Sequence, residues 1–221
     1  MPEITLYGNA VSAFVAKARI ALDFKGLPYR EAPAPGGHGA PEYRALIPAG
    51  SIPGLTIDGA PLHDSNAIIE YLEEIAPEPA LLPKAPYERA LARALLGFHD
   101  TRLEPAASAM FPLIKRDWRR EPERVAAGLE GIEAAYARLA PLVTRAPFHL
   151  GAAPTIADLS YPVTIQMIGM LTAEFGRKIA PPPAIAAWAR ASGEIPAAAR
   201  SLRIAGAAME AWLAGFRGAR A

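Results

Sequence analysis

Two neighbouring stretches dominate this sequence: SIPGL at residues 51–55 and LHDSNAIIEYL at residues 62–72. Proline has no backbone N–H, so Pro53 fits the entrance of a strand, where the apolar run of residues 54–57 begins. An X-Pro bond at such an entrance can be cis, and we expect the Ile52–Pro53 bond to be cis. The backbone of Ile52 then faces outward, where it can pair with a short extended peptide.

The second stretch predicts a turn followed by a helix whose first turn suits an anion. Asp58-Gly59 is a signal for a tight hairpin. Asp64 and Ser65 then begin a helix, and the unpaired amides at a helix N-terminus attract carboxylates. One edge of the fold thus offers pairing to a peptide, and the neighbouring helix end offers an anion site. Together they predict a small acidic peptide as the ligand.

The composition is that of a globular protein with enough material for two hydrophobic cores. The chain has 221 residues, of which 52% are hydrophobic and 20% charged, a balance that excludes a largely disordered chain. Its net charge is +1 without a basic block, so nucleic acid is not an expected partner. No stretch reaches the roughly 18 apolar residues of a membrane span. Because the N-terminus also lacks a signal-peptide pattern, we expect a cytoplasmic protein without membrane partners.

The sequence contains no cysteine. Disulfides, thiolate metal sites and Cys-x-x-Cys redox chemistry are therefore excluded, and any thiol chemistry must use a thiol that a ligand brings. His63, His99 and His149 lie far apart in sequence without acidic residues at ligand spacing. No metal site is predicted from them.

Strand and helix signals alternate over residues 1–76. Short apolar runs bounded by glycine, proline or turn residues predict strands, and apolar positions at helical spacing predict the helices between them. The order predicts an α/β domain, βαβαββα, with a small mixed sheet. Strands are expected at 4–7, at 27–31, and on both sides of the 58–59 turn, with helices at 12–24, 42–46 and 64–75.

Residues 77–86 are rich in proline and predict a linker, after which strand signals disappear. Residues 87–221 predict an all-helical domain, in which Pro105 and Pro112 are expected to bend or break the first helical segment. Residues 155–158, Thr-Ile-Ala-Asp, have the pattern of a capping box, in which hydroxyl and carboxylate bond reciprocally to backbone amides ahead of an apolar helix.

Four motifs occur in an order and at a spacing that resemble the cytosolic glutathione transferase family, in its serine-type, bacterial-like form. The resemblance covers nearly the whole chain. It implies a thioredoxin-like N-terminal domain that holds glutathione and a helical C-terminal domain that covers a cleft for the second substrate. The motifs are LYG with SAFVAK at residues 6–8 and 12–17, SIPGL at 51–55, DSNAI at 64–68 and TIAD at 155–158.

The resemblance implies that Ser12 is the catalytic residue, whose hydroxyl donates to the glutathione sulfur and favours the thiolate. The alternative is that Ser12 only caps its helix, which stabilises a helix by about 1 kcal/mol; the two roles are compatible. Tyr7 is the rival hydroxyl, because tyrosine-type members use a tyrosine at the end of the first strand. The serine five residues later favours Ser12.

The resemblance also implies the glutathione-binding residues. Pro53 presents the backbone of Ile52 to the cysteinyl part of glutathione. Ser65 and its amide bind the γ-glutamyl carboxylate, and Asp64 orients the site or pairs with the amino group.

For each of three further residues, a role in binding glutathione stands beside a plain structural or surface role. His38 and Ser51 are candidates for the glycyl carboxylate, against plain solvent exposure. Asp100 either reaches the glutathione amino group of a partner subunit or is a surface aspartate.

The resemblance implies an enzyme that conjugates the glutathione thiolate to an apolar electrophile and forms a homodimer, with glutathione as co-substrate and no metal. Two alternatives remain: glutathione-dependent peroxide reduction, isomerisation or dehalogenation on the same fold, or a non-catalytic binding or regulatory protein. Candidates for lining the second-substrate cleft are Phe14, Met110, Phe111 and Tyr161, although each such residue is more often ordinary core.

Overall fold

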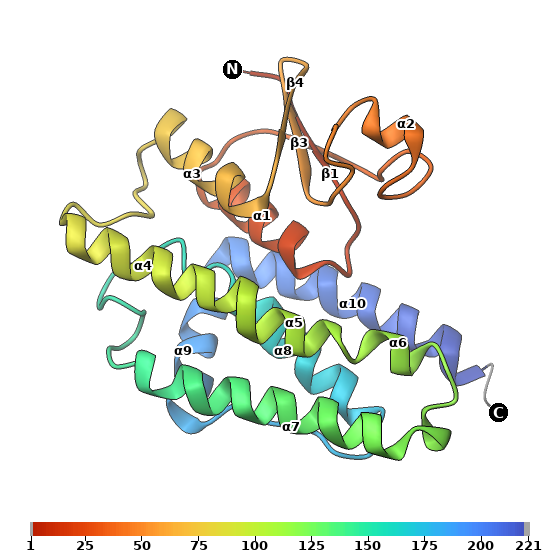
Figure 1. The fold of residues 1–221 in the computed structure, drawn as a ribbon. Helices are drawn as coiled ribbons and strands as arrows, with labels where there is room; N and C mark the ends of the chain where they lie inside the picture. Colours follow the sequence, from red (N-terminus) through yellow and green to blue (C-terminus); the bar gives the residue numbers. More distant parts are fainter. Residues whose placement is uncertain (1, 219–221) are drawn as a thin grey trace.

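Four short strands form one mixed sheet in the first part of the chain (Figure 1). The structure is a computed structural model and describes residues 2–218. The strands are β1 (Ile4–Tyr7), β2 (Arg30–Ala32), β3 (Gly54–Ile57) and β4 (Ala60–His63), in the order β2-β1-β3-β4. β2 runs parallel to β1, whereas β3 is antiparallel to both β1 and β4.

Three helices complete this domain: α1 (Ala13–Phe24), α2 (Pro41–Arg44) and α3 (Ser65–Ile75). The observed order is βαβαββα, which confirms the prediction. The second strand overlaps its predicted range of 27–31 only in part, because β2 begins at Arg30, opposite Thr5. Pro28 has no amide to give to the ladder, and the amide of Leu27 instead bonds to the carbonyl of Leu22 at the end of α1.

Helix α1 is buried along most of its length, between the sheet and the helices that follow (Figure 1). Its apolar side chains join those of the sheet and of α3 in one core. Arg19 is buried in α1 as well, and its guanidinium donates to both carboxylate oxygens of Glu31 at 2.8 and 2.9 Å. This bidentate pair fixes α1 against strand β2.

The rest of the described chain is helical. Pro105 lies just after a π-helical turn inside a continuous helical run, and Pro112 lies in the first turn of a new helix, so the predicted bend or break is seen at both prolines. The elements are α4 (Pro86–Phe98), a π-helical turn (His99–Leu103), α5 (Glu104–Ser108), α6 (Phe111–Ile114), α7 (Pro122–Leu139), α8 (Tyr161–Ala173), α9 (Pro183–Gly193) and α10 (Pro196–Gly218). Within residues 2–218, no helix is long and apolar enough to cross a membrane.

The buried carboxylate of Asp158 accepts several hydrogen bonds in the segment that leads into α8. Asp158 accepts from the amide and the hydroxyl of Thr155, both at 2.7 Å, from the amide of His149 at 2.9 Å and from the indole N–H of Trp188 at 2.5 Å. The predicted capping box is thus half correct. The Thr155 hydroxyl donates to the carboxylate instead of accepting the Asp158 amide, which bonds to the Thr155 carbonyl. A buried anion needs donors, and the hydroxyl supplies one.

Candidate functional site

The register of the sheet brings the predicted binding residues to one end of the N-terminal domain. Tyr7 at the end of β1 lies opposite Gly54, and Gly54 lies opposite His63. Pro53, which precedes β3, and Asp64, which follows β4, therefore lie at the same end of the sheet. The loop between Tyr7 and α1 starts from that end too.

The loop before β3 has the predicted backbone geometry. The Ile52–Pro53 bond is cis, as expected. Ser51 is exposed, and its carbonyl accepts a hydrogen bond from the Tyr43 hydroxyl at 3.0 Å. Burial raises the pKa of Tyr43 to about 12, so this hydroxyl stays a donor at neutral pH. A Cβ on Gly54 would lie 2.3 Å from the same hydroxyl oxygen, so only glycine fits there.

Ser12 caps helix α1 and also lines the cleft between the two domains. Its Oγ accepts from the Val15 amide at 3.3 Å. This cap uses the oxygen as an acceptor, and no group within residues 2–218 accepts the hydroxyl hydrogen, which leaves it for a ligand. A Cβ on Gly8 would lie 2.3 Å from Val15, so the glycine lets the loop pass over the start of α1.

The start of α3 is held by an aspartate in an unusual conformation. Asp64 has φ +70°, in the left-handed region that side-chain-bearing residues rarely adopt. Its Oδ1 accepts from the amides of Asn66 at 2.8 Å and Ala67 at 3.1 Å. The amide of Ser65, at the head of the helix, keeps no acceptor among the described residues. Ser65 itself is buried. This helix end retains one free donor for an anion.

The cleft has a volume of about 640 Å³ and is lined from both domains. Ser12, His38 and Ile52 line it from the N-terminal domain. Phe14 and Phe111 line it as predicted. Met110 and Tyr161 do not, and their expected role was wrong.

Both of these side chains are fully buried in the helical core. The Tyr161 hydroxyl donates to the carbonyl of Leu95 at 2.6 Å, and its ring packs on Trp188 at 4.6 Å between centroids. The sulfur of Met110 lies 2.4 Å from where a Cβ on Gly128 would sit, so it fills the space over α7.

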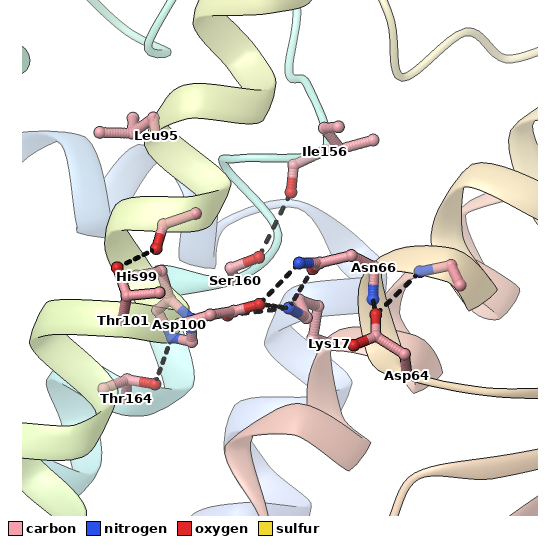
Figure 2. A network of polar contacts seen from close by, with 12 residues as sticks. Lys17, Asp64, Asn66, Leu95, His99, Asp100, Thr101, Ile156, Ser160 and Thr164 are labelled. Carbon is pink, nitrogen blue, oxygen red and sulfur yellow. Dashed lines mark hydrogen bonds and ion pairs between the residues drawn. The ribbon is translucent and has the colours of Figure 1, made fainter.

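A buried polar network joins α1, α3 and the π-helical turn after α4 (Figure 2). The ammonium of Lys17 in α1 is fully buried. It donates to Oδ1 of Asn66 at 2.6 Å and to both oxygens of Asp100 at 3.0 Å, and the Asn66 amide group donates to Asp100 at 2.8 Å. Because Asn66 belongs to the first turn of α3, the network ties that turn to α1 and to the helical domain.

The charge state of this network follows from its contacts. Burial opposes ionisation of Asp100, but the hydrogen bond from His99 and the charge of Lys17 prevail and hold the pKa of Asp100 below its usual value. Burial lowers the pKa of Lys17 and of His99, and Asp100 partly offsets both shifts. An ionised Asp100 can only accept, so Nδ1 of His99 donates to it at 2.6 Å. Nε2 then accepts from the Thr164 hydroxyl at 2.8 Å.

The sequence reasoning did not identify Lys17, Asn66 or His99 as parts of the site. A lysine in the middle of the apolar run of residues 13–22 was the available signal. Asp100 is neither a plain surface residue nor in contact with the cleft; its side chain is 17% exposed and bonded on three sides.

Tyr7 does not line the cleft. It is half-buried, and its ring lies against Tyr43 at 6.0 Å between centroids. The described part of the chain contains no group of three acidic or histidine side chains that could hold a metal ion.

Comparison with known proteins places this architecture in a family. Residues 6–80 match the family model described as the glutathione S-transferase N-terminal domain. A maleylacetoacetate isomerase of Aspergillus fumigatus is 32% identical over 181 residues, which span 72% of this chain and 74% of that protein. The chain belongs to the glutathione S-transferase family.

Further relatives of this glutathione S-transferase family member differ in how much they share with it. A maleylacetoacetate isomerase of Pseudomonas aeruginosa is 38% identical over 125 residues, but the match spans only 58% of that protein. The theta-class glutathione S-transferase of Xanthomonas axonopodis pv. citri, solved with glutathione bound, is 30% identical. It has a TM-score of 0.74 and the comparison covers 91% of this chain and 98% of that one. The fold, with its α/β and helical domains, is therefore that of the family.

Proposed function

We propose that this family member is a glutathione transferase that ionises glutathione at Ser12 and directs the thiolate at an electrophile in the cleft. The observation that carries the proposal is the Ser12 hydroxyl, which lines the cleft at the N-terminus of α1 with its hydrogen free. The absence of cysteine in the sequence means that the reacting thiol has to come from the ligand.

Two effects of α1 favour the thiolate over the thiol. The Ser12 hydroxyl donates a hydrogen bond to the sulfur, which stabilises the charged form. The N-terminus of the twelve-residue helix adds partial positive charge nearby. Both effects lower the pKa of the bound thiol, so more of it is reactive at neutral pH.

The remaining candidate residues hold glutathione in place. The Ile52 backbone, presented by Pro53, pairs with the cysteinyl unit. The hydroxyl of Ser65 and its free amide bind the γ-glutamyl carboxylate at the start of α3. The Asp64 carboxylate holds that helix end and attracts the amino group. His38 lines the cleft and, with Ser51, is a candidate for the glycyl carboxylate.

We assign residues 1–76 to the glutathione-binding domain, residues 77–86 to a linker and residues 87–221 to the second-substrate domain. A homodimer and a cytoplasmic location stay predictions, as does contact between Asp100 and the glutathione of a partner subunit. With Asp100 bound to Lys17 and His99, such a contact would be made by a carboxylate that is already held in position.

A second candidate is glutathione-dependent isomerisation. It is favoured by the names of two relatives, the maleylacetoacetate isomerases of P. aeruginosa and A. fumigatus. In such a reaction the thiolate adds to the substrate and leaves again, so glutathione is not consumed. Loss of glutathione thiol during turnover distinguishes conjugation from isomerisation.

The test is binding followed by turnover. Calorimetry with glutathione and with its dimethyl ester separates a site that needs the carboxylates from nonspecific binding. Turnover of 1-chloro-2,4-dinitrobenzene with glutathione then reports conjugation. Absence of glutathione binding contradicts the proposal, and binding without turnover of either a generic electrophile or a cis-enone isomerisation substrate indicates a non-catalytic protein.

A further inference from the structure

A carboxyl group lies in the wall of the cleft, in what was expected to be an apolar surface. Glu104 is the first residue of α5 and lines the same cavity as Ser12. It is only 8% exposed. A buried acidic side chain in a substrate cleft is unusual enough to need a reason.

Only one of the two carboxyl oxygens of Glu104 is hydrogen-bonded to another described residue. Its Oε1 accepts from the hydroxyl of Ser108, one turn further along α5, at 2.6 Å. No donor among the described residues bonds to Oε2. This oxygen is also not one of the fully buried polar atoms that lack a hydrogen-bond partner. One carboxyl oxygen is thus held by Ser108, and the other is left for whatever occupies the cleft.

The surroundings of Glu104 favour its neutral form. Burial raises the pKa of the carboxyl, and the nearby charge of Asp100 raises it further. The Ser108 hydroxyl and the charge of Lys17 act in the opposite direction but do not cancel the rise. Lys115, which follows α6 and lines the same cleft, is exposed, so solvent screens its charge.

We propose that Glu104 is a second catalytic residue, which gives a proton to the electrophile, and that the preferred electrophiles are therefore α,β-unsaturated carbonyl compounds. This inference rests on the proposed function. Phe14 and Phe111 supply apolar contacts for the carbon skeleton, and the Phe111 ring packs edge to face against Trp212 at 5.1 Å between centroids. The acid faces the cavity that receives the thiolate from the Ser12 side.

The reaction balances without another reagent. The glutathione thiolate attacks the β-carbon and forms a C–S bond, while the C=C π pair moves toward the carbonyl to give an enolate. Glu104 transfers its proton to the enolate, which completes addition of the thiol across the double bond. The proton that the glutathione thiol released to solvent on ionisation restores the Glu104 carboxyl, so that one thiol has added across the double bond overall. An aryl halide differs, because the halide leaves with its electron pair and no proton is needed.

This difference supplies the test. Glu104→Gln keeps the shape and can still donate a hydrogen bond, but it cannot transfer a proton. Turnover is measured with 4-phenylbut-3-en-2-one and with 1-chloro-2,4-dinitrobenzene at saturating glutathione. The ratio of enone to aryl-halide kcat should fall about a hundredfold in Glu104→Gln, the usual effect of losing a general acid. Glu130→Gln, on the exposed face of α7, is the matched control and should leave the ratio unchanged.

The pH dependence gives a second readout that a merely structural role would not move. Enone turnover by the parent should fall as the pH rises through the raised pKa of Glu104, and Glu104→Gln should lack this high-pH limb. Ser108→Ala removes a hydrogen bond that lowers the pKa of Glu104, so its high-pH limb should move to still higher pH. This variant keeps the inference testable if Glu104→Gln does not fold.

An unchanged ratio in Glu104→Gln, or a high-pH limb that Ser108→Ala does not move, overturns the inference. A parent enzyme that conjugates the aryl halide but not the enone also overturns it, while the proposed function stands. A parent that does not bind glutathione overturns the proposed function itself.

Discussion

Replacing Lys17 by methionine should destabilise the protein more than any surface substitution. The ammonium is fully buried and makes three contacts of 2.6–3.0 Å with Asn66 and Asp100. Removing one partner of a buried ion pair costs about 3–5 kcal/mol, because the other charge stays buried. Asp100 keeps its bonds from His99 and Asn66 and is 17% exposed, so we expect the lower end.

A loss of about 3 kcal/mol lowers the melting temperature of a chain of this size by roughly 6–12 °C. Urea unfolding followed by circular dichroism measures the free energy, and a thermal scan measures the midpoint. The double variant Lys17→Met with Asp100→Asn removes both charges and should recover part of the stability. A loss below about 1 kcal/mol in Lys17→Met, or additive losses in the double variant, would refute the view that this pair is a coupled buried unit.

Three other predictions concern glutathione binding, the pH dependence of stability and the oligomeric state. Ser65→Ala and Asp64→Ala should each weaken glutathione binding about ten- to hundredfold by calorimetry, since charge-assisted contacts are worth roughly 1.5–3 kcal/mol; unchanged affinities would place the site elsewhere. His99 has a lowered pKa, so as pH falls below about 6.5 the unfolded chain takes up a proton before the folded one does. The free energy of unfolding should therefore decrease between about pH 7 and pH 5, and His99→Asn should flatten this slope; an equal slope contradicts the assignment. Light scattering should give twice the chain mass of 23.4 kDa, and a monomer at micromolar concentration would exclude the homodimer.

Local chemistry explains why so much of the N-terminal domain could be predicted. Pro53, the Asp58-Gly59 turn and the Asp64 cap act on their immediate neighbours, so their effects are visible in a short stretch of sequence. The breaks at Pro105 and Pro112 are local for the same reason. These residues led to the element order, and the cis bond before Pro53 was also expected.

The features that were missed depend on contacts between distant residues. Lys17, Asn66 and Asp100 meet only when α1, α3 and the turn after α4 are packed together. Whether Tyr161 faces the cleft or the core depends on the carbonyl of Leu95, which is 66 residues away. An apolar pattern along one helix identifies the face that is buried. It does not tell whether that face packs against the hydrophobic core or lines the cleft.

The glutamate in the cleft was missed for a different reason. Glu104 precedes a proline within the helical segment expected after residue 87, and a glutamate on such a helix is normally exposed. Its sequence context therefore predicts an ordinary exposed residue. Only the three-dimensional arrangement shows that it is buried in the wall of the cavity that Ser12 also lines.

The ionisation of bound glutathione tests the central claim most directly. The thiolate absorbance of glutathione bound to the parent and to Ser12→Ala is titrated against pH, with the dissociation constant measured in parallel. The bound thiol should ionise well below its value in water in the parent. In Ser12→Ala its pKa should rise while the affinity stays nearly unchanged, because Ser65 still binds the γ-glutamyl carboxylate and Asp64 still attracts the amino group. Identical titration curves, with only the loss of about 1 kcal/mol expected for an N-cap, would contradict the catalytic role of Ser12 and make Tyr7→Phe the next variant to measure.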